Sequence, residues 1–233
     1  KKGDTKITLG TGACTLTNIG SDLISSKSAL TALSFVYKGE PQYAFECLTA
    51  FAGATISWIE NNLNLINDPS DSERISLELE DNGGVYVIPA FAGLSAPYWL
   101  PSAKAMFYGI TAATNFKHIV RASLESVAYQ IVAYLEYIQK NEKIDISKII
   151  IDGGMTNNRF LMQLISNLSQ KEISIPLFPD MSSYGSLLMG LIGSGKCKNL
   201  DELEQFRVES RSFFPTKDER SISDFTTWKE IID

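Results

Sequence analysis

The feature that most constrains the fold is a strand that passes directly into two glycines and then a helix. The apolar run 148–151 leads into Asp152, Gly153 and Gly154, and a helical pattern opens at Asn158. Glycine has no side chain to hold a ligand away from the backbone, and the first N–H groups of a helix carry partial positive charge. The segment therefore predicts a place where the backbone approaches a flat or anionic ligand.

A second glycine loop strengthens this prediction. The segment Leu9-Gly10-Thr11-Gly12 also ends a strand-like run, at the other end of the chain. Each segment alone is a moderate signal for a binding site. Together they favour a chain that presents bare backbone at the ends of two strands.

Composition limits the class of protein. The chain has 233 residues, 44% of them hydrophobic, which supports a substantial core in one large domain or two small ones. The formal charge is −6 with dispersed Lys and Arg, so nucleic-acid binding is disfavoured. Cys14, Cys47 and Cys197 lie far apart and fit reduced thiols in a cytoplasmic protein. No apolar run reaches the roughly 18 residues of a membrane span, and no signal peptide is evident.

The order of the predicted elements indicates one α/β domain. Strands are predicted over 5–9, 14–18, 29–37, 42–47, 85–90, 106–110, 146–151 and 172–177. Helices are predicted over 51–65, 70–80, 115–139, 158–169 and 182–192, with short ones at 199–206 and 224–231. A hairpin is expected around Lys38-Gly39-Glu40-Pro41. Antiparallel strands followed by strands alternating with helices predict a mixed sheet with helices on both faces. The chain starts with Lys rather than Met, so we expect that it is processed or part of something longer.

Several motifs carry a resemblance to a known family. One signature consists of Tyr108-Gly109-Ile110, seven further residues and HIVRASLE at 118–125. The others are PAFAGLSAPYW at 89–99, FAGATISW at 51–58 and the Gly153-Gly154 block. In this order, across about 3–214, the motifs resemble the C-terminal domain of the FGGY carbohydrate kinases. The 89–99 loop is similar to the glycerol-kinase version.

The resemblance implies an actin-like (ribonuclease-H-like) fold, in which ATP lies in the cleft between two halves of the enzyme. Residues 1–233 would be the C-terminal nucleotide-binding domain, and the N-terminal half would be absent from this chain. The full enzyme would move the γ-phosphate of ATP to a sugar or polyol, with Mg²⁺ held largely by phosphates and water. The implied partners are that sugar or polyol, the N-terminal half and a second copy in a homodimer.

The resemblance also implies a set of nucleotide-binding residues. They are Gly10, Thr11, Gly53, Ser57, Gly153, Gly154 and Asn158. Gly10, Thr11 and Gly53 would serve the phosphates, because a glycine-flanked turn frees N–H groups and the Thr hydroxyl adds a donor. Gly154 and Asn158 would serve the adenosine. A plain glycine hairpin at Gly10 and an ordinary helix cap at Asn158 are the alternatives.

Three departures from the family pattern affect the expected chemistry. The catalytic Asp, expected in a Gly-Asp-Gln segment, is missing, so we expect the chain alone to be inactive. Cys14 stands where glycerol kinases carry a Phe that packs on the substrate carbons, which suggests a longer polyol or a sugar. Ser57 stands where they often place a Gln near the adenine.

Other polar residues have structural explanations. His118, the only histidine, is expected to lie in the first turn of a helix. Glu125 is expected to be a bonded interior carboxylate, and Asp180 is expected to cap a helix. No residues have metal-ligand spacing. A non-enzymatic actin-like nucleotide-binding or scaffold module is the alternative function. The loop 96–99 and the signature 118–125 favour the kinase.

Overall fold

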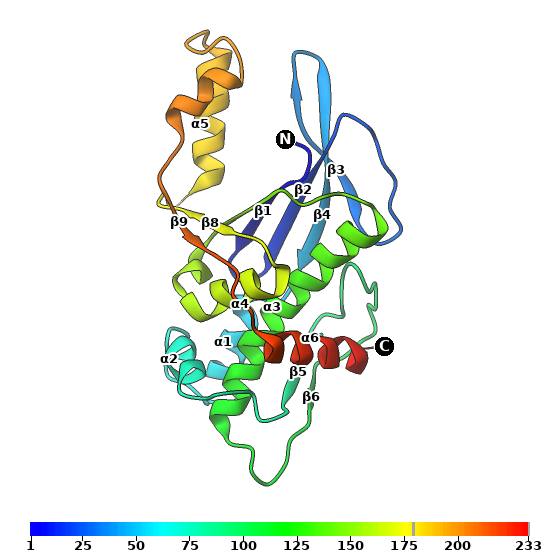
Figure 1. Ribbon diagram of the computed structural model, residues 1–233, viewed down its shortest axis with the longest axis vertical. Coiled ribbons are helices and arrows are strands. Elements are labelled where there is room, and N and C mark those ends of the chain that lie inside the picture. The colour runs from blue at the N-terminus through cyan, green and yellow to red at the C-terminus, as the bar shows by residue number, and fades with distance from the viewer. Residues whose placement is uncertain (179, 233) are drawn as a thin grey trace.

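A seven-stranded mixed sheet forms the upper half of the molecule in Figure 1. The computed structural model describes residues 1–178 and 180–232. The strand order is β3-β4-β2-β1-β7-β8-β9. The bounds are β1 Asp4–Leu9, β2 Ala13–Gly20, β3 Leu30–Tyr37, β4 Glu40–Thr49, β7 Lys148–Asp152, β8 Ile173–Pro176 and β9 Ser210–Phe213.

The strand directions confirm the predicted mixed sheet. The first four strands pair antiparallel, whereas β1–β7 and β7–β8 pair parallel. The expected hairpin joins β3 and β4 through Lys38 and Gly39, whose φ angles are +51° and +84°. Two consecutive positive φ angles match the twist of the flanking strands, which is why glycine suits this loop.

Helices pack around a long central helix, α3. The helices are α1 Gly53–Asn61, α2 Asp71–Leu77, α3 Phe116–Asn141, α4 Arg159–Ser169, α5 Met181–Gly193 and α6 Glu219–Ile232. A second sheet pairs β5 (Tyr86–Ile88) with β6 (Met106–Tyr108). Figure 1 shows α3 running from this lower part to the main sheet, and most of its middle turns are buried. Among the described residues, no helix is both long and apolar enough to span a bilayer.

Some boundaries differ from the sequence predictions for local reasons. Helix α1 ends at Asn61 rather than 65, because Asn61 and Asn62 bond back to the carbonyls of the preceding turn and Asn64 adopts a φ of +53°. The helix expected over 199–206 is a 3₁₀ helix, η2, over Asp201–Phe206. Strand β9 was not predicted; its short, polar segment is ordered by antiparallel pairing with β8.

The two faces of the main sheet differ sharply. Alternate residues of β1 and β2, such as Ile7 and Thr15, are buried towards the helices, while Lys6 and Leu16 on the opposite face are only half-buried. Helix packing on both faces was expected. Helix α5 instead extends away from the sheet in Figure 1, and none of its residues is buried. The second face, which carries Lys6 and Leu16 and is here called the open face, is therefore accessible.

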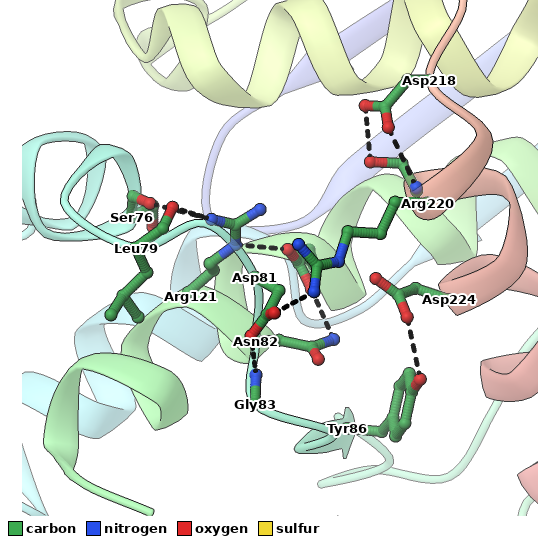
Figure 2. Close-up of polar contacts among 12 residues, drawn as sticks. Ser76, Leu79, Asp81, Asn82, Gly83, Tyr86, Arg121, Asp218, Arg220 and Asp224 are labelled. Atoms are coloured by element: carbon green, nitrogen blue, oxygen red, sulfur yellow. Dashed lines mark hydrogen bonds and ion pairs between the residues drawn. The ribbon is translucent and has the colours of Figure 1, made fainter.

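A buried polar network ties α3 to α2. Figure 2 shows Arg121 reaching from α3 to the carbonyl oxygens of Ser76 and Leu79. Its Nε donates to Glu125 Oε1 at 2.7 Å, and Asn82 Nδ2 donates to Glu125 Oε2 at 3.0 Å. Glu125 is 2% exposed, which confirms the predicted interior carboxylate. Burial raises the pKa of Glu125, and the contacts with Arg121 and Asn82 oppose that shift.

Removing one partner of the buried ion pair should destabilise the fold. In Glu125→Ala, the Arg121 guanidinium remains buried without its carboxylate, and we expect a loss of about 3–5 kcal/mol in the free energy of unfolding. The double variant Arg121→Met/Glu125→Leu should lose less, because no buried charge is left unpaired. Urea denaturation measures both. Equal losses in the two variants would contradict this account of the network.

Candidate functional site

One cavity of about 440 Å³ is lined by most of the nucleotide-binding residues that the family resemblance implies. Its walls come from the β1–β2 turn, the start of α1, the chain entering α2 and the 3₁₀ helix η1 (Gly154–Asn157). Six of the seven predicted nucleotide-binding residues line it: Gly10, Thr11, Gly53, Ser57, Gly154 and Asn158. Segments more than one hundred residues apart in the sequence therefore meet at a single site.

The β1–β2 turn and helix α1 form one wall through direct backbone contacts. The N–H of Gly53 donates to the carbonyl oxygen of Gly10 at 3.0 Å, and Ala54 N–H donates to that of Thr11 at 2.9 Å. A Cβ on Gly53 would lie 2.7 Å from the Gly10 oxygen, so only glycine permits this approach. Within the turn, the N–H of Gly10 donates to Gly12 O at 2.9 Å, so this N–H group is already engaged. The Thr11 hydroxyl, with no hydrogen bond to any described residue, stays available as a donor.

Gly154 and Asn158 form the opposite wall. A methyl group on Gly154 would meet no protein atom within 4 Å, so this glycine leaves open space. Asn158 caps α4, where its Oδ1 accepts the N–H of Leu161 at 2.9 Å. Its Nδ2 lies 3.3 Å from Ser72 Oγ. The expected helix cap is confirmed, and the same side chain also borders the cavity.

Sequence reasoning missed the wall that α2 supplies. Ser70, Ser72 and Glu73 line the cavity together with Pro69. Glu73 Oε2 accepts the backbone N–H of Arg159 at 3.0 Å, which joins α2 to the start of α4. No local pattern reports a contact between positions 86 residues apart, so the sequence offered no signal for it.

Two predicted residues lie outside this cavity. Gly153 has a φ of +102°, and a Cβ there would lie 2.4 Å from the carbonyl oxygen of Leu9. It therefore lets η1 lie against the end of β1. Cys14 lies on the open face of the sheet, where its Sγ is 3.6 Å from Glu46 Oε1.

The remaining polar residues singled out from the sequence have structural contacts. His118 Nδ1 accepts the N–H of Asn115 at 3.1 Å in a capping box at the start of α3. Asp180 caps α5 by accepting the N–H groups of Ser182 and Ser183, at 3.1 and 2.9 Å. Both contacts agree with the predicted structural roles. The described residues contain no group of His, Cys, Asp or Glu side chains arranged to hold a metal ion.

The composition of the cavity suits binding rather than bond breaking. Glu73 is the one acid or base among the described residues that line it, and a backbone N–H engages its carboxylate. Glycines, hydroxyls and the amides of Asn157 and Asn158 form the rest of the polar lining. Such a lining can hold a flat polar ring beside η1 and an anionic group beside Thr11.

Comparison with known proteins places this chain in a family. The model of the FGGY family of carbohydrate kinases, C-terminal domain, matches residues 5–194. The glycerol kinase of Clostridium perfringens is 40% identical over 234 residues, which cover 100% of this chain and 47% of that protein. The glycerol kinase of Haemophilus influenzae is 39% identical, over 99% of this chain and 46% of that protein. The chain spans about half the length of the curated relatives it matches.

Solved structures agree on the fold. A crystal structure of Plasmodium falciparum glycerol kinase with ADP has a TM-score of 0.90 and 30% identity, over 100% of this chain and 47% of that one. A ligand-bound xylulose kinase from Lactobacillus acidophilus has a TM-score of 0.83 at 18% identity. The match covers 99% of this chain and 47% of that one. These likenesses confirm the predicted actin-like α/β fold.

The two adjacent glycines at the start of η1, Gly153 before it and Gly154 as its first residue, should respond differently to alanine. Gly153→Ala places a Cβ against Leu9 and strains a positive φ, so we expect a loss of about 1–3 kcal/mol in the free energy of unfolding. Gly154→Ala points a methyl group into open space and should change the free energy of unfolding by less than about 0.5 kcal/mol. Urea denaturation of both variants tests the contrast, and similar losses would count against the positions assigned to the two glycines.

Proposed function

Because this chain belongs to the FGGY family of carbohydrate kinases, we propose that it forms the nucleotide-binding half of a glycerol-kinase-like enzyme. The whole enzyme transfers the γ-phosphate of ATP to a hydroxyl of a polyol or sugar. Residues 1–233 form its C-terminal domain, and an N-terminal half completes the cleft. The match to the family model over 5–194 supports this division.

The observation that carries the proposal is the meeting of six predicted residues at one cavity. Its volume, about 440 Å³, lies within the range of small-molecule sites. The open space at Gly154 and the amide of Asn158 fit an adenosine, and Thr11 beside the Gly10–Gly53 contact fits the phosphates. The Plasmodium falciparum relative was solved with ADP, which supports a nucleotide here.

ATP supplies the phosphoryl group and comes with Mg²⁺. A magnesium ion of this kind would be held mainly by phosphate oxygens and water. Thr11 and the neighbouring turn would orient the phosphates by hydrogen bonding. Ser57, one turn into α1, would border the nucleotide in place of a longer amide side chain.

The acceptor and the catalytic base belong mostly to the other half. Among the described residues, the one acid or base that lines the cavity is Glu73, and a backbone N–H engages its carboxylate, so this chain alone should not turn over. Cys14 borders the acceptor from the open face.

The enzyme is cytoplasmic, in keeping with three unpaired thiols. It forms a homodimer, for which the exposed Met106 and Tyr108 on β6 offer an apolar surface.

A coupled assay of ADP release tests the function. The protein that carries this domain together with its N-terminal half should release ADP with glycerol or with four- to six-carbon polyols and sugars as acceptors. The domain of residues 1–233 by itself should release none above background. Absence of turnover with every acceptor in the two-domain protein would favour the non-enzymatic module instead.

The amide of Asn158 can be tested separately from its capping role. Asn158→Asp keeps the oxygen that accepts Leu161 N–H but removes the NH₂ donor and its contact with Ser72 Oγ, so the free energy of unfolding should fall by no more than about 1 kcal/mol while the Kd for ADP rises about tenfold. Isothermal titration calorimetry and urea denaturation measure the two quantities. Asn115→Asp is the matched control, because Asn115 caps α3 outside the cavity. An unchanged Kd in Asn158→Asp would remove this residue from the nucleotide site.

A further inference from the structure

The strand register places a row of polar side chains on the open face, next to the Gly10 turn. Asp152 pairs with Thr8 across β7 and β1, and Thr8 pairs with Cys14 across β1 and β2. In the next row, Lys6 pairs with Leu16, which pairs with Glu46 on β4. These residues lie at the same end of the sheet as the turn that borders the nucleotide cavity.

Lys6 and Asp152 form one side of this group. Lys6 Nζ lies 3.0 Å from Asp152 Oδ2 and also donates to the Thr8 hydroxyl. Asp152 is 7% exposed, and its Oδ1 has no hydrogen-bond partner among the described residues. The Lys6 charge is therefore neutralised by Asp152, although its side chain is still about one-third exposed.

Glu46 forms the other side, and its carboxylate lacks a strong partner. Its only hydrogen bond to a described residue comes from the Cys14 thiol at 3.6 Å, and it makes no ion pair with any described residue. Burial and the adjacent Glu46 carboxylate raise the pKa of Cys14, so this thiol stays protonated and remains a weak donor. A half-buried carboxylate with one weak donor has acceptor capacity left for a ligand hydroxyl.

We propose that Glu46 is a specificity-determining residue that accepts hydrogen bonds from hydroxyls of the acceptor beside Cys14. The inference rests on the proposed function, which brings the acceptor to the open face at this point. The small Cys14 side chain leaves room next to the carboxylate, so a polyol longer than glycerol can reach Glu46. The negative charge selects neutral polyols and disfavours sugar acids, because a carboxylate on the acceptor would face Glu46.

The test compares Glu46→Gln with Glu40→Gln in the protein that contains both halves. Glu40 is exposed at the start of the same strand, so its variant is a matched control. In Glu46→Gln we expect KM for erythritol and xylitol to rise about tenfold, while KM for ATP and the melting temperature stay unchanged. The ratio of kcat/KM for gluconate to that for xylitol should increase. Glu40→Gln should match the wild type throughout.

The outcomes separate the two proposals. A wild-type protein that phosphorylates no acceptor overturns the proposed function. An active wild type whose acceptor KM values are unchanged by Glu46→Gln overturns the role of Glu46 alone. If Glu46→Gln also changes KM for ATP and the melting temperature, the role of Glu46 in acceptor binding is overturned as well, because such changes indicate a structural residue. As an independent readout, xylitol should slow alkylation of Cys14 by iodoacetamide, and equal rates with and without xylitol would count against the site.

Discussion

Backbone packed directly on backbone is the contact on which the cavity depends, at the end of the central strand β1. Gly53 lies against the carbonyl of Gly10, and Gly153 lies against that of Leu9. Side chains larger than a hydrogen atom would separate these segments, and the walls from α1 and η1 would no longer meet. The site is therefore fixed by main-chain geometry at the end of β1, and the side chains that line it are added to a rigid frame.

The buried polar network has an indirect part in this frame. Arg121 holds the C-terminal end of α2 through the carbonyls of Ser76 and Leu79, as Figure 2 shows. The N-terminal end of the same helix presents Ser72 and Glu73 to the cavity. A charge pair on α3 thus helps to position a wall that it does not touch. Such pairs are retained in some proteins for specificity of packing rather than for stability.

Sequence patterns predicted the parts of this fold that depend on local chemistry. The alternation of β1 and β2, the length of α3 and the cap at Asn158 all follow from side chains near in sequence. The family resemblance also identified six residues of the cavity. The α2 wall and strand β9 were missed because only long-range contacts order them. Gly153 lies outside this cavity, and its positive φ and contact with Leu9 give it a role in the fold that no spacing rule distinguishes from ligand binding.

Helix α5 has a consequence for handling the domain in isolation. Its Leu187 is 58% exposed and its Met189 38%, and the neighbouring Leu177 is 63% exposed. Exposed apolar side chains that gather on one surface are a liability for aggregation. A preparation of this domain alone would be colloidally unstable, with light scattering that grows with protein concentration and falls when mild detergent is added. Its shelf life would then be limited by self-association and not by unfolding of the core.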